Sequence, residues 1–168
     1  TVSRVGRMVS RTSVKIIKAH QRPAKIDDVS YVGTHMRQED MEECFAHSGS
    51  SPVQSLFECF FTSNPCMTMI SRHGNPMGMW GIIKQPNKSG QVWMLGCKNM
   101  LEDSRDKREF LRQSRIELKK LHKEFPVLFN YIDARNTVHL RWLTFMGFTI
   151  IKKHETFGYE GRPFYEFV

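Results

Sequence analysis

The chain has 168 residues, the length of one domain, and its 40% apolar content with 12 Phe and 3 Trp excludes disorder throughout. Its formal net charge is +8, and residues 1–25 contribute +7 because they hold seven Lys or Arg and no acid. The other 143 residues therefore carry only +1 (8 − 7). We expect a basic N-terminal arm at 1–25 and a nearly neutral domain at 26–168.

No apolar run approaches the roughly 18 residues of a membrane helix, and the N-terminus lacks the apolar core of a secretory signal. We therefore expect neither a membrane span nor a signal peptide. The cysteines show no CxxC motif and no zinc-ligand spacing. We predict no metal site, and free thiols in a reducing compartment at Cys44, Cys59, Cys66 and Cys97.

The arm repeats its basic residues at helical spacing, so a helix would carry them on one stripe. Gly6 and the β-branched Val and Ile residues disfavour a free helix, so we expect the arm to fold on contact with a partner. Pro23 would end that helix. The predicted partner-binding residues are Arg4, Arg7, Arg11, Lys15, Lys18, Arg22 and Lys25.

The first elements of the domain follow from apolar periodicity, caps and turn residues. Ser51 can cap a helix that has Pro52 at its first position, and Pro126 ends a long Lys/Arg-rich helix. The predicted order is a strand at 29–36, a helix at 38–47, a helix from Pro52, strands at 66–72, 77–84 and 91–97, and the long helix from Asp103 or Ser104 to Phe125.

The last elements surround a short helix. A half-apolar strand from Val127 to Ile132 precedes Asn136 and Thr137, whose side-chain oxygens can cap a helix that Gly147 ends. We expect Trp142 and Phe145 to lie buried against the sheet. A hairpin of two strands closes the chain, and its residues are 149–154 and 163–168.

An Asn, ten helical residues, Gly-Phe and a β run form the C-terminal signature of the GCN5-related N-acetyltransferase (GNAT) fold. The stretch Asn136–Phe148 and the order of elements resemble that fold. The resemblance implies an α/β domain with a mixed, mostly antiparallel sheet flanked by helices. It also implies a cleft for acetyl-CoA, with a glycine-rich pyrophosphate turn before the long helix and a Tyr that acts as general acid.

The residues that this resemblance assigns to catalysis are missing. No glycine lies between Gly96 and Gly147, and three acids stand where the phosphates would bind and would repel them: Glu102, Asp103 and Asp106. Leu143 occupies the general-acid position and cannot donate a proton. His139 replaces a usual small residue and is a candidate base. We expect no catalytic residue and no cofactor, only a vestigial cleft at Asn136, His139 and Leu143, with Leu143 facing it.

The C-terminal half is also similar to a narrower GNAT-like group, the internal virion proteins of short-tailed, podovirus-type bacteriophages. The shared motifs are Trp93-Met94-Leu95, Phe129-Asn130-Tyr131, Asn136-Thr137-x-His139-x-Arg141-x-Leu143, Phe164 and Phe167. The resemblance implies a virion protein, made in the host cytoplasm and assembled in multiple copies with the portal, core or tail.

Three functions stay open. The chain is a structural phage protein on a degenerate acetyltransferase fold, an active acetyl-CoA-dependent N-acetyltransferase with a divergent cofactor loop, or a protein that binds packaged DNA through its arm. The arm could also be a solvated tail, or could fit an acidic groove on a neighbouring subunit. No aromatic residue precedes Tyr31, which weakens a role in stacking on single-stranded nucleic acid.

Overall fold

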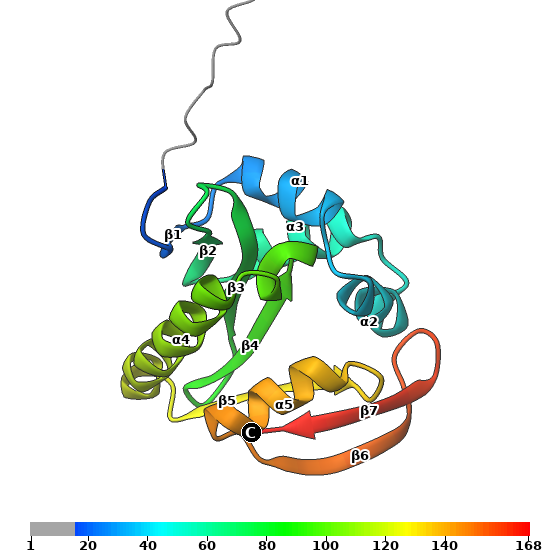
Figure 1. The fold of residues 1–168 in the computed structure, drawn as a ribbon. Helices are drawn as coiled ribbons and strands as arrows, with labels where there is room; N and C mark the ends of the chain where they lie inside the picture. Colours follow the sequence, from blue (N-terminus) through cyan, green and yellow to red (C-terminus); the bar gives the residue numbers. More distant parts are fainter. Residues whose placement is uncertain (1–15) are drawn as a thin grey trace, which may run out of the picture.

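The computed structural model describes residues 16–168, and they form one seven-stranded sheet with helices on both of its faces (Figure 1). The strands are β1 (His20–Pro23), β2 (Cys66–Ile70), β3 (Pro76–Lys84), β4 (Ser89–Gly96), β5 (Val127–Asp133), β6 (Ile150–Phe157) and β7 (Arg162–Phe167). The helices are α1 (Ile26–Thr34), α2 (Gln38–Ser48), α3 (Pro52–Thr62), α4 (Ser104–Glu124), α5 (Thr137–Met146) and the short 3-10 helix η1 (Lys98–Leu101).

The sheet has the order β1-β2-β3-β4-β5-β7-β6, and every neighbouring pair is antiparallel except β4 and β5. Those two strands run parallel and pair only at Ser89–Val127, Gly90–Leu128 and Gln91–Phe129. From Asn130 onward β5 pairs with β7 alone, and β4 and β5 diverge (Figure 1). The predicted α/β architecture with a mixed, mostly antiparallel sheet is confirmed.

Each face of the sheet has its own apolar cluster. On one face Val29 and Val32 of α1 and Leu56 of α3 pack against Trp93 and Leu95 of β4. On the other face α4 packs over β2, β3 and β4 through a second cluster, whose buried members are Met69, Met77, Trp80, Ile82, Met94, Met100, Phe110, Phe125 and Leu128. A third cluster joins α5 to β5 and β7. Alternate residues of β4 thus serve opposite faces.

The predicted strand at 29–36 is wrong, because residues 29–34 lie in α1 and Met36 makes only an isolated β-bridge, to Cys97 just after β4. Asp28 accepts a hydrogen bond from the Lys25 backbone amide at 2.8 Å, which helps to start the helix. The first strand is β1 instead, inside the predicted arm and paired with β2. The expected helical stripe is therefore wrong around Arg22. The predictions for Arg4, Arg7, Arg11 and Lys15 lie outside the described residues.

The buried face of α5 also differs from the prediction. Leu143 is 3% exposed, but Phe145 is 48% exposed and its ring lies under the guanidinium of Arg115, 3.9 Å from ring centroid to Cζ. Trp142 is partly buried and packs against Phe110. The predicted burial of Phe145 is wrong because α5 turns Leu143 and Met146 inward, which places Phe145 over α4.

Two further observations concern the whole described part of the chain. None of the helices within residues 16–168 is long and apolar enough to cross a membrane. The four cysteines are free, and burial raises the pKa of each thiol, to about 12 for Cys44, Cys59 and Cys97 and to about 11 for Cys66. Protonated thiols of this kind are poor nucleophiles.

Candidate functional site

A cavity of about 130 Å³ lies where β4 and β5 diverge, bounded by α4 and α5. Its lining is mostly apolar and aromatic, with Glu43 and Glu117 as its acids and no Lys or Arg. Of the predicted cleft residues, His139 and Leu143 line it. The aromatic members of the lining are Trp80, Trp93, Phe110, Tyr131, Trp142, Phe148 and Phe167.

Asn130 sits at the point where the two strands part. Its Oδ1 accepts hydrogen bonds from the Tyr131 amide at 2.8 Å and from Gln91 Nε2 at 3.0 Å. Its Nδ2 donates to the Val92 carbonyl at 2.8 Å. One side-chain amide thus replaces the missing rung of the ladder, because it donates and accepts at once. The Val92 carbonyl and the Tyr131 amide, which the divergence leaves without strand partners, are therefore hydrogen-bonded.

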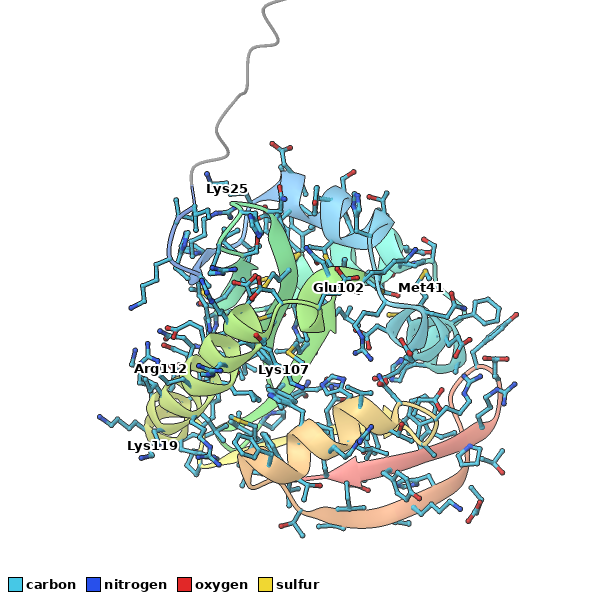
Figure 2. All side chains as sticks on the ribbon, viewed as in Figure 1. Lys25, Met41, Glu102, Lys107, Arg112 and Lys119 are labelled. Atoms are coloured by element: carbon cyan, nitrogen blue, oxygen red, sulfur yellow. The ribbon has the colours of Figure 1, made fainter. Side chains whose placement is uncertain are left out.

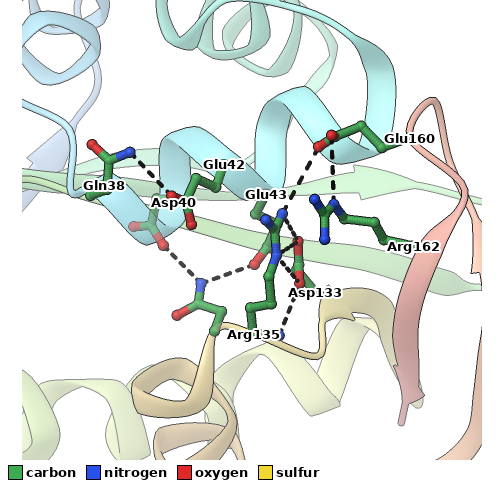
Figure 3. Close-up of polar contacts among 9 residues, drawn as sticks. Gln38, Asp40, Glu42, Glu43, Asp133, Arg135, Glu160 and Arg162 are labelled. Atoms are coloured by element: carbon green, nitrogen blue, oxygen red, sulfur yellow. Dashed lines mark hydrogen bonds and ion pairs between the residues drawn. The ribbon is translucent and has the colours of Figure 1, made fainter.

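Helix α2 closes the open end of the divergence. Asp40 Oδ2 accepts the Gly96 amide at 2.8 Å, and Asp40 Oδ1 accepts Asn136 Nδ2 at 3.0 Å. Glu43 Oε2 accepts the same Nδ2 at 2.9 Å. The α2 carboxylates therefore connect the end of β4 to the start of α5. Figure 3 shows Asp40 and Glu43 side by side on α2.

The predicted capping role of Asn136 is wrong. Asn136 occupies the N-cap position of α5, but its side chain makes no capping bond and is 1% exposed. Its Nδ2 points to two carboxylates on α2, and hydrogen bonds to charged groups are stronger than those of a neutral cap. Its Oδ1 is buried without a partner among the described residues.

Glu43 lies in an acidic setting. Burial, followed by the charge of Asp40, raises the pKa of the Glu43 carboxyl to about 8, and the charge of Asp133 acts in the same direction. Arg135 Nη2 pairs with Asp133 at 2.7 Å and lies 3.9 Å from Glu160, in the β6–β7 turn (Figure 3). Arg135 is thus occupied by Asp133, and Glu43 keeps a proton well above the usual range for a carboxyl.

His139 and Trp142 bring polar atoms to the cavity that are not used. His139 is 8% exposed, its Nδ1 has no hydrogen-bond partner among the described residues, and burial lowers the pKa of its imidazole. Trp142 Nε1 is likewise buried without a partner in residues 16–168. The two rings lie 5.3 Å apart between centroids. The cavity wall therefore offers one indole donor and one neutral imidazole nitrogen to a ligand.

The N-terminus of α4 does not fit a pyrophosphate group. Asp103 Oδ1 already accepts the backbone amides of Arg105 at 2.8 Å and Asp106 at 3.3 Å, and its Oδ2 holds Arg72 Nη2 at 2.6 Å. Arg72 holds the pKa of Asp103 near 2, so that carboxylate stays charged. Helix η1 fills the loop between β4 and α4, with Met100 buried. The amides that a phosphate would use are taken by a carboxylate.

Three of the seven predicted partner-binding residues of the arm lie inside the described part of the chain. Lys18 is exposed before β1. Arg22 forms two hydrogen bonds to the buried Asp28, at 2.7 and 2.9 Å. Lys25 is the residue before α1. Arg22 is therefore bound to the domain by this ion pair. Separately, residues 16–168 hold no group of His, Cys, Asp or Glu that could bind a metal.

Sequence reasoning missed Asp40 and Glu43 and left Asn130 without a role. Asp40 and Glu43 stand three apart on α2, so a shared face was available as a signal. Their partner Asn136 is more than ninety residues away, and no local pattern indicates that contact.

Comparison with known proteins identifies both a family and a fold. The model of the family described as "Bacteriophage T7, probable scaffold protein Gp13" matches residues 66–155. No curated protein matches the chain. Solved structures match nearly the whole chain. The acetyltransferase (GNAT family) from Bacillus anthracis has a TM-score of 0.64 at 11% identity, covering 92% of this chain and 95% of that one.

Two more solved structures have a similar fold. The N-acetyltransferase from Staphylococcus aureus Mu50 has a TM-score of 0.65 at 15% identity and covers 89% of this chain and 98% of its own. The spermidine N-acetyltransferase from Vibrio cholerae, solved with CoA and spermine, has a TM-score of 0.64 at 11% identity and covers 89% and 93%. At such identities the likeness establishes the fold alone, and the predicted GNAT fold is confirmed.

Proposed function

Because the chain belongs to the family of the bacteriophage T7 probable scaffold protein Gp13, we propose that it is a structural protein of the phage particle, associated with the portal, core or tail. It uses an acetyltransferase fold as a rigid block and carries out no catalysis. It is made in the host cytoplasm, enters the virion in multiple copies, and contacts other phage structural proteins, in part through its basic arm.

The observation that carries the non-catalytic part of this proposal is the start of α4. Asp103 caps the helix with its own carboxylate and is paired with Arg72. A pyrophosphate would have to displace a charged group from the same amides and would meet Asp106 behind it. Like charges within a few ångströms of each other repel by roughly several kcal/mol before screening, which is comparable to the free energy of binding a ligand.

The general-acid position supports the same proposal. Leu143 stands there, buried at 3% exposure, with no proton to give. His139 is the one imidazole that lines the cavity within the described residues. The alternative of an active N-acetyltransferase keeps one observation in its favour, which is the cavity itself between β4 and β5.

Calorimetry with acetyl-CoA tests the proposal. We expect no saturable heat at about millimolar ligand, with an active acetyltransferase of the same fold as the positive control. A micromolar dissociation constant, roughly −8 kcal/mol, would overturn the non-catalytic proposal and favour the enzyme. Mass spectrometry of purified, fractionated particles tests the other half, since a structural protein must be found in the virion.

A further inference from the structure

The edge of β4 that faces the cavity is not fully paired. The Cys97 amide bonds to the Met77 carbonyl at 2.7 Å, so the odd residues of β4 point their backbone groups at β3 and the even ones point at β5. Val92 is satisfied by Asn130, and Gly96 by Asp40 and the Arg37 amide. Between them Met94 faces the cavity, and no strand of residues 16–168 pairs with it on that side.

The cavity beside Met94 has the size of one large side chain. A cavity of roughly 150 Å³ lined by apolar residues can hold a benzene molecule, and this one measures about 130 Å³. Trp142 Nε1 and His139 Nδ1 are buried in its wall without partners among the described residues. An extended peptide supplies what is missing: backbone groups for Met94, a carbonyl for the indole, and a side chain for the cavity.

The charge of the cleft selects the kind of peptide. Its lining holds Glu43 and Glu117 and no Lys or Arg, and Glu117 accepts a hydrogen bond from Lys120 at 3.0 Å. The outer surface of α4, by contrast, exposes Arg112 and Lys119 (Figure 2). A basic segment is thus repelled by the outside of α4, whereas in the cleft beneath it a cation would stabilise the ionised form of Glu43. Aromatic walls suit a methionine, whose sulfur contacts rings favourably.

We propose that this cleft binds residues 1–15 of a second copy of the chain, as an extended segment beside Met94 with Met8 in the cavity. This inference rests on the proposed function, because it requires a cleft that is not used for acetyl-CoA. The segment reads TVSRVGRMVSRTSVK, with four basic residues, no acid and no aromatic residue, and Met8 is its largest apolar side chain. Its charge complements that of the cleft when Glu43 is ionised.

For geometric reasons we assign the bound segment to a second copy and not to the same chain. In the same chain Ile17 is held at the Arg72 carbonyl, 2.9 Å from its amide, and β1 follows at the edge of the sheet. Helix α4 lies over β2, β3 and β4, so the segment would have to pass around that helix to reach the cleft. Fifteen extended residues span about 50 Å, enough to reach a neighbour. Such a head-to-tail contact links copies in series, into a closed ring or an open filament.

Light scattering of the full chain over a range of concentrations tests this proposal. We expect the mass to rise with concentration and to return to that of a monomer when excess synthetic peptide of residues 1–15 is added. A scrambled peptide should leave the assembly intact. At pH 9, where Glu43 is ionised, Glu43→Gln should weaken association about tenfold, whereas Glu58→Gln on α3, across the sheet, should leave it unchanged.

A mixing experiment separates docking from damage to the fold. At pH 9, Met8→Asp impairs the segment and Glu43→Gln impairs the cleft, so each variant should associate weakly alone. Mixed together, the intact cleft of the first and the intact segment of the second should form a one-to-one pair. A chain that stays monomeric at all concentrations, an equal effect of the scrambled peptide, or failure of the mixture to pair would overturn the inference. Saturable heat with acetyl-CoA would instead overturn the proposed function.

Discussion

At the scale of single residues, two asparagines hold the divergence of β4 and β5 at its two ends. Asn130 bonds Tyr131 and Val92 at the start of the split, and Asn136 bonds Asp40 and Glu43 at its open end. Both positions require an amide. At 130 the side chain must donate and accept together, and at 136 it must donate to two carboxylates. An aspartate would place a charge against the Val92 carbonyl in one case and against two acids in the other.

Glu43 makes the stability of the fold depend on pH. Its pKa is raised to about 8 in the folded chain from 4.5, so between these values the folded chain keeps a proton that the unfolded chain releases. The contribution of Glu43 therefore falls as the pH rises from 4.5 through 8. Glu43→Gln keeps the acceptor for Asn136 and removes the titration. We expect this variant to be more stable than the parent at pH 9, on the order of 2 kcal/mol.

Urea unfolding at pH 6 and pH 9 measures this difference. Glu58→Gln, an exposed change on α3, is the matched control and should follow the parent at both pH values. Parallel stability curves for the parent and Glu43→Gln would show that Glu43 does not titrate in this range.

At the scale of elements, helix α5 has one inward and one outward side, and two substitutions distinguish them. Leu143→Ala removes a side chain buried among Ile132 and Phe167 and should destabilise the fold by about 2–5 kcal/mol. Phe145→Ala removes a ring that is 48% exposed and should cost only about 1 kcal/mol. Thermal or urea unfolding of both variants measures the order. A larger loss for Phe145→Ala would mean that α5 presents the other side to the sheet.

The elements from α2 onward could be predicted from the sequence because their signals are local. Pro52, Asp103 and Gly147 mark helix ends, and Gly74 and Pro86 mark turns between strands of alternating pattern. The N-terminal elements could not. Residues 29–36 hold only a few apolar side chains, among them Val29 and Val32, and do not distinguish the helical period from the strand period. Packing against α3 favours the helix. Strand β1 has four residues inside a basic stretch, and its pairing with β2 carries no pattern of its own.

The site was predictable only in part, because some of its contacts join residues that lie far apart in the sequence. His139 and Leu143 follow from position within a helix, and they do line the cavity. The contacts of Asp40 with Gly96 and Asn136 close loops of 56 and 96 residues. Such contacts depend on how the finished sheet brings α2 over the split, and one-dimensional periodicity does not contain that information.

At the scale of the whole molecule, the arm and the domain are not separated at residue 25. Arg22 pairs with the buried Asp28, which also accepts the Thr68 hydroxyl at 2.8 Å, and β1 covers the edge of β2. Removing residues 1–25 would leave Asp28 buried without its cation and would expose that edge, at a cost of about 3–5 kcal/mol for the broken pair alone. A loss of assembly in such a truncation would not distinguish a missing partner contact from a damaged fold.

A truncation that removes only residues 1–15 avoids this ambiguity, and we predict that it enters particles poorly. Its companion keeps the composition of these residues but shuffles their order. A docked segment needs Met8 and its charges at fixed positions, so the shuffled chain should also enter particles poorly. Packaged DNA would bind either order through counterion release, without regard to position. Quantitative mass spectrometry of purified particles measures the copy number of each variant. If the shuffled chain is incorporated as well as the parent, binding to packaged DNA replaces docking to protein.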